Sequence, residues 1–537
     1  MKEEDLKNDV QLLPLRNLRA GEVTASYEAG RLRYIGCNGY EAVRMIFYAM
    51  RDENWVTFPM KISDETIVEK ERSFEVRYRG SINTEKIKFE ADFSITGNAD
   101  GTIVFYMEGR ALNSFQSKRN GLGVHHPVHA CAGRPVEIIH PGDVSEKSVF
   151  PKLISPTRPF KDVTGMRYTT AYGTRTEIVF EGDEFEMEDQ RNWSDDSFKT
   201  YSGPQYKTPM LDVREGDTMF HRITVRLNST NTETIYPKQQ VLQGPFPEIG
   251  YGFSEGDVIP TTGEQITAIP HGHLSVEVML SDKKWRENLQ QRIARAGLTN
   301  IDLRLLVYFT EFSEKEAAGL SAFINDTRMH VTSVLVLSEH GTAPEADNYH
   351  IVLHELRKAC PNLKIGFGNA TWFANINATI NREVNCDFTG FVVNPQVHQT
   401  DERSILENLL SQHTILDTLR DRVGEKPVQV HFQFSKVDDP RWHTQLGAWW
   451  LLNAIASMAS AGVITICELT GRNAIFRQHK EHSPLMKLLK TLSDFAPVHI
   501  RAERMLSVAD PMSTIRSAKV ILENAEGEAI AYTMTDI

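Results

Sequence analysis

The chain has 537 residues, of which 41% are hydrophobic and 24% are charged, and 71 acidic against 59 basic residues give a formal charge of −12. Such a composition predicts a folded protein of about two to four domains and excludes disorder as the overall class. The acidic balance and the lack of an Arg/Lys-rich stretch argue against a nucleic-acid partner.

The cysteines and the N-terminus indicate a compartment. Five widely spaced cysteines without a C-x-x-C pair are typical of a reducing compartment and exclude a disulfide framework or a Cys-rich zinc site. The N-terminus, MKEEDLKNDV, lacks the basic start and apolar core of a signal peptide. The longest apolar stretch, about 446–461, contains Asn453 and Ser457 and predicts a buried helix. We expect a cytoplasmic protein with no membrane partner.

Residues 1–250 predict an all-β sandwich. Runs of alternating hydrophobicity occur at 74–80, 86–95 and 101–109, and the sequence NADG at 98–101 is a turn signal. Long amphipathic helices are absent from this part of the sequence. Closely spaced strands with short turns favour one large sandwich.

The pattern changes after the Pro/Gly-rich stretch 243–263, and we assign 251–265 to a linker. Across 266–500 short apolar runs alternate with helical segments, which predicts a catalytic (β/α)8 TIM barrel, with an open doubly wound sheet as the alternative. The expected strands are 274–280, 303–309, 331–338, 364–369, 387–393, 428–434, 463–468 and a weak 497–500. Residues 501–537 predict a short C-terminal β-hairpin tail able to pair with the N-terminal strands.

In such a barrel the active site lies at the C-terminal ends of the strands. Glu468 ends the run VITIC, where burying a carboxylate with no partner would be costly. An ion pair with a neighbour such as Arg472 is the structural alternative. Asn369 and Trp372 follow the fourth expected strand. His398 follows the fifth, either as a catalytic group or only as part of its loop.

A dense polar segment lies outside the barrel, EDQRNWSDDSFKTY at 188–201. Its carboxylates, amides, cations and aromatics are typical of carbohydrate binding, although a solvated surface loop is the alternative. The candidate substrate-binding residues of this segment are Glu188, Asp189, Arg191, Asn192, Trp193 and Lys199, and the barrel adds Trp372 and Arg472. The stretch 118–127 is a second candidate and adds His126. His125 and His126 point to opposite faces of a strand, so they are poor joint ligands of one metal.

Several common motifs are missing from the sequence. It contains no G-x-S-x-G nucleophile elbow, no complete G-x-G-x-x-G and no P-loop. His271-x-His273 precedes an expected barrel strand and so falls at the end that serves stability. We expect neither a metal ion nor another cofactor.

Three segments resemble the bacterial D-apionate lactonase family of sugar-acid catabolism: 188–201, LGVHHP at 122–127 and ITICELTGR at 464–472. The resemblance runs from about residue 20 to 500. It implies a β-sandwich followed by a barrel, and hydrolysis of D-apionolactone to D-apionate in apiose catabolism. The barrel also resembles glycoside hydrolases with glutamates after strand four and at strand seven. Glu468 matches the second position, but Asn369-Ala370 stands where those enzymes have Asn-Glu.

Retaining glycosidases need two carboxylates, whereas hydrolysis of a lactone needs one base, one proton donor and one oxyanion stabiliser. We predict that Glu468 activates a water, that His398 protonates the ring oxygen and that Asn369 or Arg472 stabilises the oxyanion. The alternatives are a glycosidase using Glu468 with Glu311 or Glu188, a non-catalytic carbohydrate-binding protein on a hydrolase scaffold, and a metal-assisted lactonase using His340 and His398. The expected partner is a small sugar lactone, and the oligomeric state is left open.

Overall fold

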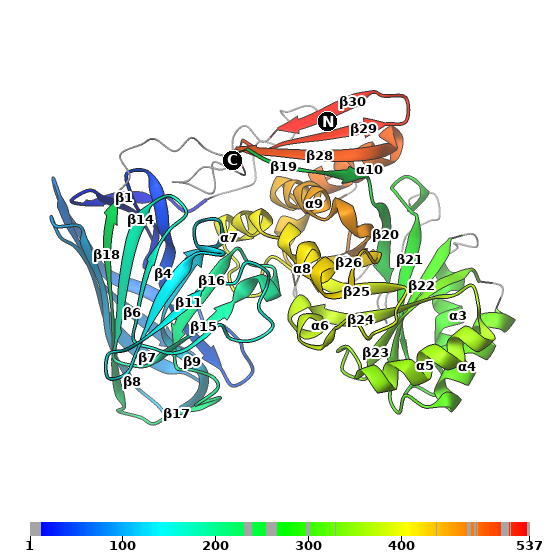
Figure 1. Ribbon diagram of the computed structural model, residues 1–537, viewed down its shortest axis with the longest axis horizontal. Helices are drawn as coiled ribbons and strands as arrows, with labels where there is room; N and C mark the ends of the chain where they lie inside the picture. Colours follow the sequence, from blue (N-terminus) through cyan, green and yellow to red (C-terminus); the bar gives the residue numbers. More distant parts are fainter. Residues whose placement is uncertain are drawn as a thin grey trace.

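The computed structural model describes residues 12–229, 239–253, 266–296, 301–327, 329–435, 438–469, 474–476, 480, 482–505, 515 and 517–533. It contains a two-sheet sandwich, a closed parallel barrel of eight strands and a small four-stranded sheet. Figure 1 shows the sandwich at the left, the barrel at the right and the small sheet above the barrel. The predicted order of an N-terminal β-sandwich, a TIM barrel and short C-terminal strands is confirmed.

Two antiparallel sheets of nine strands each form the sandwich. The first sheet runs in the order β1 (Arg16–Ala20), β2 (Val23–Glu28), β3 (Arg31–Cys37), β4 (Tyr40–Asp52), β9 (Phe115–Pro127), β16 (Ser197–Ser202), β15 (Phe185–Asp189) and β12 (Phe160–Val163), and β17 (Leu211–Val213) also pairs with β9. The second runs in the order β11 (Val144–Val149), β10 (Pro135–His140), β13 (Gly165–Thr169), β14 (Thr174–Glu181), β18 (Thr218–Ser229), β8 (Thr102–Ala111), β7 (Lys88–Gly97), β6 (Ser73–Asn83) and β5 (Lys61–Lys70). The short helix α1 (Val128–Cys131) follows β9.

The strands expected at 74–80, 86–95 and 101–109 are confirmed as β6, β7 and β8. Alternate residues of β7 and β8 are buried, including Phe93 and Phe105, because one face of this sheet packs on the other sheet. At the predicted turn, the Gly101 N–H donates to the Asn98 carbonyl at 3.0 Å. Gly101 has φ +89°, a conformation that glycine adopts without strain.

The first sheet differs from the second because β4, β9 and β16 are buried on both faces. One face packs in the sandwich core, and the other faces a cavity and loops of the barrel. Polar side chains on that second face are therefore removed from water and need partners or a ligand.

The barrel strands are β20 (Glu248–Phe253), β21 (His273–Met279), β22 (Asp302–Phe309), β23 (Val331–Ser338), β24 (Lys364–Trp372), β25 (Phe388–Val393), β26 (Val428–Gln433) and β27 (Gly462–Cys467). The helical segments among and after them are α3 (Trp285–Ala296), α4 (Glu314–Asp326), α5 (Ala346–Ala359), α6 (Phe373–Thr379), α7 (Glu402–Glu407), η3 (Asn408–Leu410), α8 (His413–Val423), η4 (Pro440–His443), α9 (Gln445–Ser457), η5 (Ala459–Ala461) and α10 (Pro484–Phe495). α9 confirms the predicted buried helix, since each of its residues is buried. Within the described residues, none of the helices has both the length and the apolar character needed to cross a membrane.

The sequence analysis missed the first barrel strand, β20. This strand spans the expected boundary between the sandwich (1–250) and the linker (251–265), and it pairs in parallel with β21 and β27. The sequence EIGYGF was not recognised as a strand because its two glycines interrupt the apolar pattern. Gly250 is required by packing: a Cβ there would lie 2.4 Å from the His273 ring.

The prediction of 497–500 as the eighth barrel strand is wrong. These residues belong to β28 (Pro497–Met505), which pairs with β19 (Gln239–Pro245) and with β29 (Lys519–Asn524). The tail does form a hairpin, β29 with β30 (Ala529–Thr533). It pairs with β28 rather than with strands of the sandwich, because β28 precedes it in the chain and offers a free edge.

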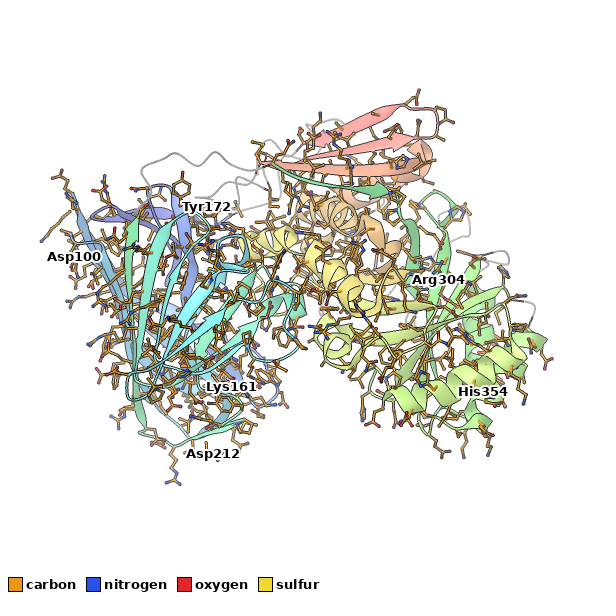
Figure 2. All side chains as sticks on the ribbon, viewed as in Figure 1. Asp100, Lys161, Tyr172, Asp212, Arg304 and His354 are labelled. Atoms are coloured by element: carbon orange, nitrogen blue, oxygen red, sulfur yellow. The ribbon has the colours of Figure 1, made fainter. Side chains whose placement is uncertain are left out.

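Polar side chains fill the N-terminal end of the barrel, as expected for the end that serves stability. His273 Nδ1 lies 2.6 Å from Glu248 Oε1, and its Nε2 lies 2.8 Å from Thr465 Oγ1. Arg304 donates to both Glu248 oxygens at 2.8 and 3.0 Å. Figure 2 shows Arg304 on the barrel and His354 on the outer helix α5. His273 of the His271-x-His273 motif therefore has a structural role.

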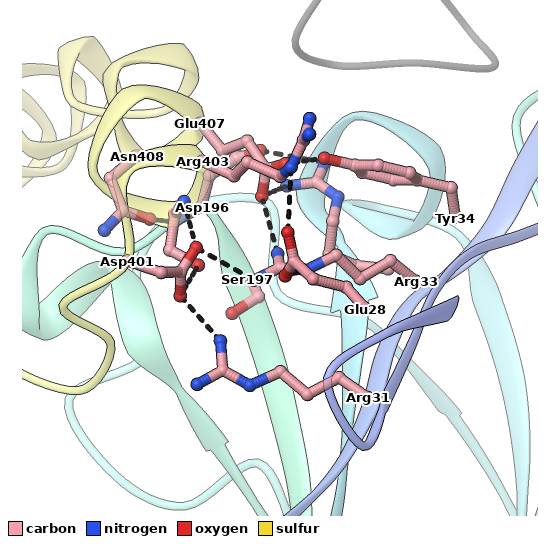
Figure 3. A network of polar contacts seen from close by, with 12 residues as sticks. Glu28, Arg31, Arg33, Tyr34, Asp196, Ser197, Asp401, Arg403, Glu407 and Asn408 are labelled. Carbon is pink, nitrogen blue, oxygen red and sulfur yellow. Dashed lines mark hydrogen bonds and ion pairs between the residues drawn. The ribbon is translucent and has the colours of Figure 1, made fainter. Parts of the chain in front are cut away.

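A buried network of ion pairs joins the sandwich to α7 of the barrel (Figure 3). The fully buried Arg33 of β3 donates to Glu28 at 2.6 Å and to Asp401 at 2.9 Å. Arg403 of α7 donates to the other Glu28 oxygen at 2.9 Å. Tyr34 donates to Glu407. Helix α7 is thereby held against strands β2 and β3 of the first sheet.

Removing the central cation should destabilise the protein. Arg33→Met leaves Glu28 and Asp401 with fewer partners in a buried place, and losing one partner of a buried ion pair costs about 3–5 kcal/mol. We expect a clear fall in the midpoint of thermal unfolding. The matched control is Arg79→Met, whose pair with Asp92 is exposed and should matter little. Equal midpoints for the two variants would contradict a stabilising role of the network.

Candidate active site

The residues expected to form one site lie in two places. Glu468, Asn369 and Trp372 lie at the C-terminal end of the barrel strands. Lys199 and several others face a cavity on the sandwich. His398 follows the barrel strand β25, but its side chain turns toward the sandwich. There it contacts Glu188, Trp193 and Asp195.

At the barrel end, Glu468 directly follows β27 and is partly buried. A second carboxylate, Glu277 of β21, lies near it, and Tyr308 donates to Glu277 at 2.8 Å. Burial, together with both carboxylates, raises the pKa of the Cys467 thiol between them. The sequence analysis missed Glu277, although a carboxylate in the apolar strand LSVEVML was a visible signal. Arg472 lies outside the described residues.

The side-chain amide of Asn369 forms hydrogen bonds with the residues that follow it at the end of β24. The side chain is fully buried, its Nδ2 donates to the Trp372 carbonyl at 3.2 Å, and its Oδ1 accepts from the Thr371 N–H at 3.1 Å. Trp372 ends β24 and precedes α6. These bonds shape the end of β24.

The segment 188–201 forms β15, the short helix η2 (Gln190–Trp193) and β16. Three of its polar residues hold the fold. Asp189 accepts from Arg191 at 2.7 and 2.9 Å, and Arg191 also donates to carbonyls of 151–153. Asn192 accepts from Asn377 of α6 at 2.8 Å, which joins the sandwich to the barrel. These three residues contact other groups of the protein, and their substrate-binding role stays a prediction.

Glu188 and Lys199 face the other way. They are directly opposite each other on β15 and β16, and they form an ion pair that is largely buried. Trp193 packs edge-on against the His398 ring, with the ring centroids 5.4 Å apart. These three residues of the segment therefore meet the loop that carries His398.

The cavity on this face of the first sheet has a volume of about 440 Å³. Strands β4, β9 and β16 supply much of its lining, and residues 398–399 of the barrel also border it. Gly121 and Gly123 border it, and a Cβ at Gly123 would lie 3.2 Å from the Phe47 ring, which also lines the cavity. The polar residues that line the cavity include Arg51, Arg119, His125, Lys199, Tyr201 and His398.

His398 is oriented by a buried acid. Its Nδ1 lies 2.5 Å from Asp195 Oδ2, and Asn408 donates to Asp195 Oδ1 at 3.0 Å. Burial raises the pKa of Asp195, whereas burial, reinforced by Lys199, lowers the pKa of His398. The imidazole is therefore neutral at pH 7. When Nδ1 carries the proton and donates to Asp195 Oδ2, Nε2, which lies 3.9 Å from Glu188 Oε1, is the basic nitrogen.

Lys199 has an unusual acidity for a lysine. Burial lowers its pKa to about 7, Glu188 opposes the shift, and Arg119 and Arg51 add to it. Burial alone would raise the pKa of Glu188, but Lys199 and Arg119 outweigh it and keep that pKa below its ordinary value. Lys199 can therefore exchange a proton near neutral pH.

Sequence reasoning missed the two arginines of the cavity, Arg51 and Arg119. They are direct cross-strand partners on β4 and β9, so only the folded sheet brings them together. A signal existed for Arg119, since it lies in the polar stretch 118–127. No motif marked Arg51.

The two neighbouring histidines point to opposite faces, as predicted. His125 lines the cavity, and its Nε2 has no partner within the described residues. His126 is fully buried between the sheets, with Nδ1 3.1 Å from the Tyr168 hydroxyl and Nε2 2.9 Å from the Thr200 hydroxyl. Burial lowers the pKa of His126 to about 3. The histidine at this cavity is His125, and the substrate-binding role of His126 stays a prediction.

The meeting of His340 with His398, which the metal-assisted alternative requires, does not form. His340 is exposed after β23, whereas His398 contacts Asp195. In the part of the chain that the structure describes, no three His, Cys, Asp or Glu residues are grouped so that they could hold a metal ion.

Comparison with known proteins finds two family models that together match most of the chain. The N-terminal domain of D-apionate lactonase matches residues 4–230, and the TIM barrel domain of D-apionate lactonase matches residues 254–434. A D-apionate lactonase of Brucella anthropi is 25% identical over 446 residues, which is 77% of this chain and 72% of that protein.

Similarities to solved structures are low. The Slr1438 protein from Synechocystis has a TM-score of 0.30 at 11% identity, covering 43% of this chain and 100% of that chain. Endo-glycoceramidase II from Rhodococcus has a TM-score of 0.36 at 7% identity, covering 52% and 88%. Likenesses at this level carry no argument about function.

The two histidines provide a matched test of which face of β9 binds ligand. His126→Leu should lower the midpoint of thermal unfolding, because it removes the buried hydrogen bonds of the imidazole with the Tyr168 and Thr200 hydroxyls, and it should leave ligand affinity unchanged. His125→Leu should weaken ligand binding and leave the midpoint of thermal unfolding nearly unchanged. Calorimetry and ligand titration of both variants check this, and weaker ligand binding by His126→Leu alone would contradict the assignment.

Proposed function

Because the chain belongs to the D-apionate lactonase family, we propose that it hydrolyses a sugar-acid lactone, D-apionolactone to D-apionate, in the sandwich cavity. The relative from Brucella anthropi, a D-apionate lactonase, supports the substrate class. The reaction adds water across an ester and needs no redox partner.

One observation supports this location best. A neutral histidine, His398, is held by the buried carboxylate of Asp195 and faces a cavity that also contains Lys199. A carboxylate that fixes the tautomer of a histidine leaves the other ring nitrogen free to act as a base. The barrel end offers the carboxylates Glu277 and Glu468 as the alternative place for the chemistry.

The chemistry then follows from proton transfers by His398 and Lys199. His398 Nε2 takes a proton from a water, whose oxygen attacks the lactone carbonyl and forms a tetrahedral oxyanion. The ring C–O bond breaks as the oxyanion collapses. Lys199 gives a proton to the departing ring oxygen, and the proton on His398 returns to Lys199 or to solvent. The new carboxylic acid loses its remaining proton to solvent, so the products are one carboxylate, one hydroxyl and one released proton.

Substituting His398 should separate this proposal from the barrel alternative. General acid–base catalysis contributes about 10²–10⁴-fold, so His398→Asn should lower kcat by that amount without unfolding the protein. Asp195→Asn should cause a smaller loss. Acid release from D-apionolactone in a pH-drop assay measures both.

The control for that experiment is Glu468→Gln at the barrel end. Near-normal turnover in Glu468→Gln supports the sandwich cavity, whereas loss in Glu468→Gln with normal turnover in His398→Asn would place the chemistry at the barrel. Release of an aryl group from aryl glycosides would favour a glycosidase. Binding of lactone without turnover of either substrate would favour a carbohydrate-binding protein. A parallel assay with chelator tests the metal-assisted scheme.

The acidity of Lys199 predicts the pH dependence. As a proton donor it must be protonated, and its pKa is lowered to about 7, so kcat/KM should fall as the pH rises through about 7. Lys199→Arg keeps its proton across this range, and its alkaline limb should disappear even if the rate is lower. Profiles of kcat/KM against pH, corrected for spontaneous lactone hydrolysis, test this prediction. If the alkaline limb is unchanged in Lys199→Arg, the limb belongs to the titration of another group.

A further inference from the structure

The cavity contains a pair of like charges that the fold places face to face. Arg51 of β4 and Arg119 of β9 are direct cross-strand partners, and both border the cavity. Like charges directly opposite each other in an antiparallel pair are destabilising. Both side chains are largely buried, at 9% and 6% exposure, so water screens them little.

Several donors of this pair lack an acceptor. Arg51 Nε, Arg119 Nε and Arg119 Nη1 are buried and bond to none of the described protein groups. The Arg119 guanidinium lies over the Tyr201 ring, with Cζ 3.4 Å from the ring centroid, which restricts its orientation. A guanidinium held in this way is preorganised for a ligand.

The neighbouring carboxylates are already engaged. Glu188 pairs with Lys199, and Asp195 accepts from Asn408 and contacts His398. The cluster therefore has three cations, Arg51, Arg119 and Lys199, against two carboxylates. Burial and the charge of Arg119 lower the pKa of Arg51 to about 10, which reflects the same repulsion.

We propose that Arg51 and Arg119, here called the arginine fork, bind the carboxylate of an open-chain polyhydroxy acid, so that the cavity binds aldonate anions more tightly than neutral polyols. Planar guanidinium donors match the two oxygens of a carboxylate. One added negative charge also balances the cluster. His125 lies on the same face of β9. Its Nε2 has no partner among the described residues and can bond a hydroxyl of the acid.

This inference deepens the proposed function, because the aldonate is what lactone hydrolysis releases. The carboxylate carbon of the product is the former carbonyl carbon of the lactone. The arginine fork therefore meets the oxyanion as it develops and keeps that oxygen after the ring opens. Accumulated aldonate competes with lactone for the same donors, so product inhibition is competitive.

Isothermal titration of the full chain tests the inference. The probes are sodium D-apionate, the neutral pentitol with the same branched skeleton, and sodium phosphate. The wild type should bind D-apionate at least about tenfold more tightly than the pentitol, and Arg119→Gln should weaken D-apionate about 10- to 100-fold with little effect on the pentitol. Arg119→Lys should lie between. The exposed Arg167→Gln on the second sheet is the matched control and should change neither affinity.

Three results would overturn the inference: no preference of the wild type for the acid, an equal loss for acid and pentitol in Arg119→Gln, or tighter binding of phosphate than of D-apionate. If Arg119→Gln fails to fold, competitive inhibition constants of acid and pentitol on the wild type decide the same question. His398→Asn separates this inference from the proposed function. It should keep aldonate binding, and normal turnover by it would refute the catalytic proposal while leaving the arginine fork to the titration.

Discussion

Buried charge between the sandwich and the barrel constrains where the candidate catalytic groups lie. Arg33 and Arg403 pair with carboxylates across this boundary, and α7 is held against β3. The loop from β25 to α7 carries His398 and ends at Asp401, which Arg33 and Arg31 both bind. Breaking such pairs is costly, so the loop cannot swing away without loss of the interface. A barrel residue is thereby fixed beside a cavity of the sandwich.

The overall fold was predictable because its two halves use different hydrophobic periods. Alternating residues identified β6, β7 and β8, and apolar runs separated by helices identified most of the barrel. The failures have specific causes. β20 was missed because packing against His273 requires glycine at 250, and glycine removes the apolar signal. β28 was placed in the barrel because a single apolar strand contains no information about which sheet it joins.

The candidate site was predicted only in part, for a similar reason. Composition identified the segment 188–201, and strand alternation separated His125 from His126. Composition alone could not separate Asp189, which holds Arg191, from Lys199, which faces the cavity, because both are charged residues of one segment. Strand order and register settle that difference. Arg51 and Arg119 come from distant parts of the sequence, and their pairing depends on the register of β4 with β9.

The net charge of −12 is a poor guide to the charge at the site. Among the described residues, the cavity lining contains four basic side chains, Arg31, Arg51, Arg119 and Lys199, and no carboxylate, so the local excess is positive although the whole chain is acidic. Buried charges interact strongly at short range, whereas charges on the surface are screened within about 8–10 Å at ordinary ionic strength. An anionic product can therefore be held by the arginines inside the cavity and yet be repelled by the acidic surface once it leaves. Local attraction governs binding, and long-range repulsion hinders recapture of the released acid.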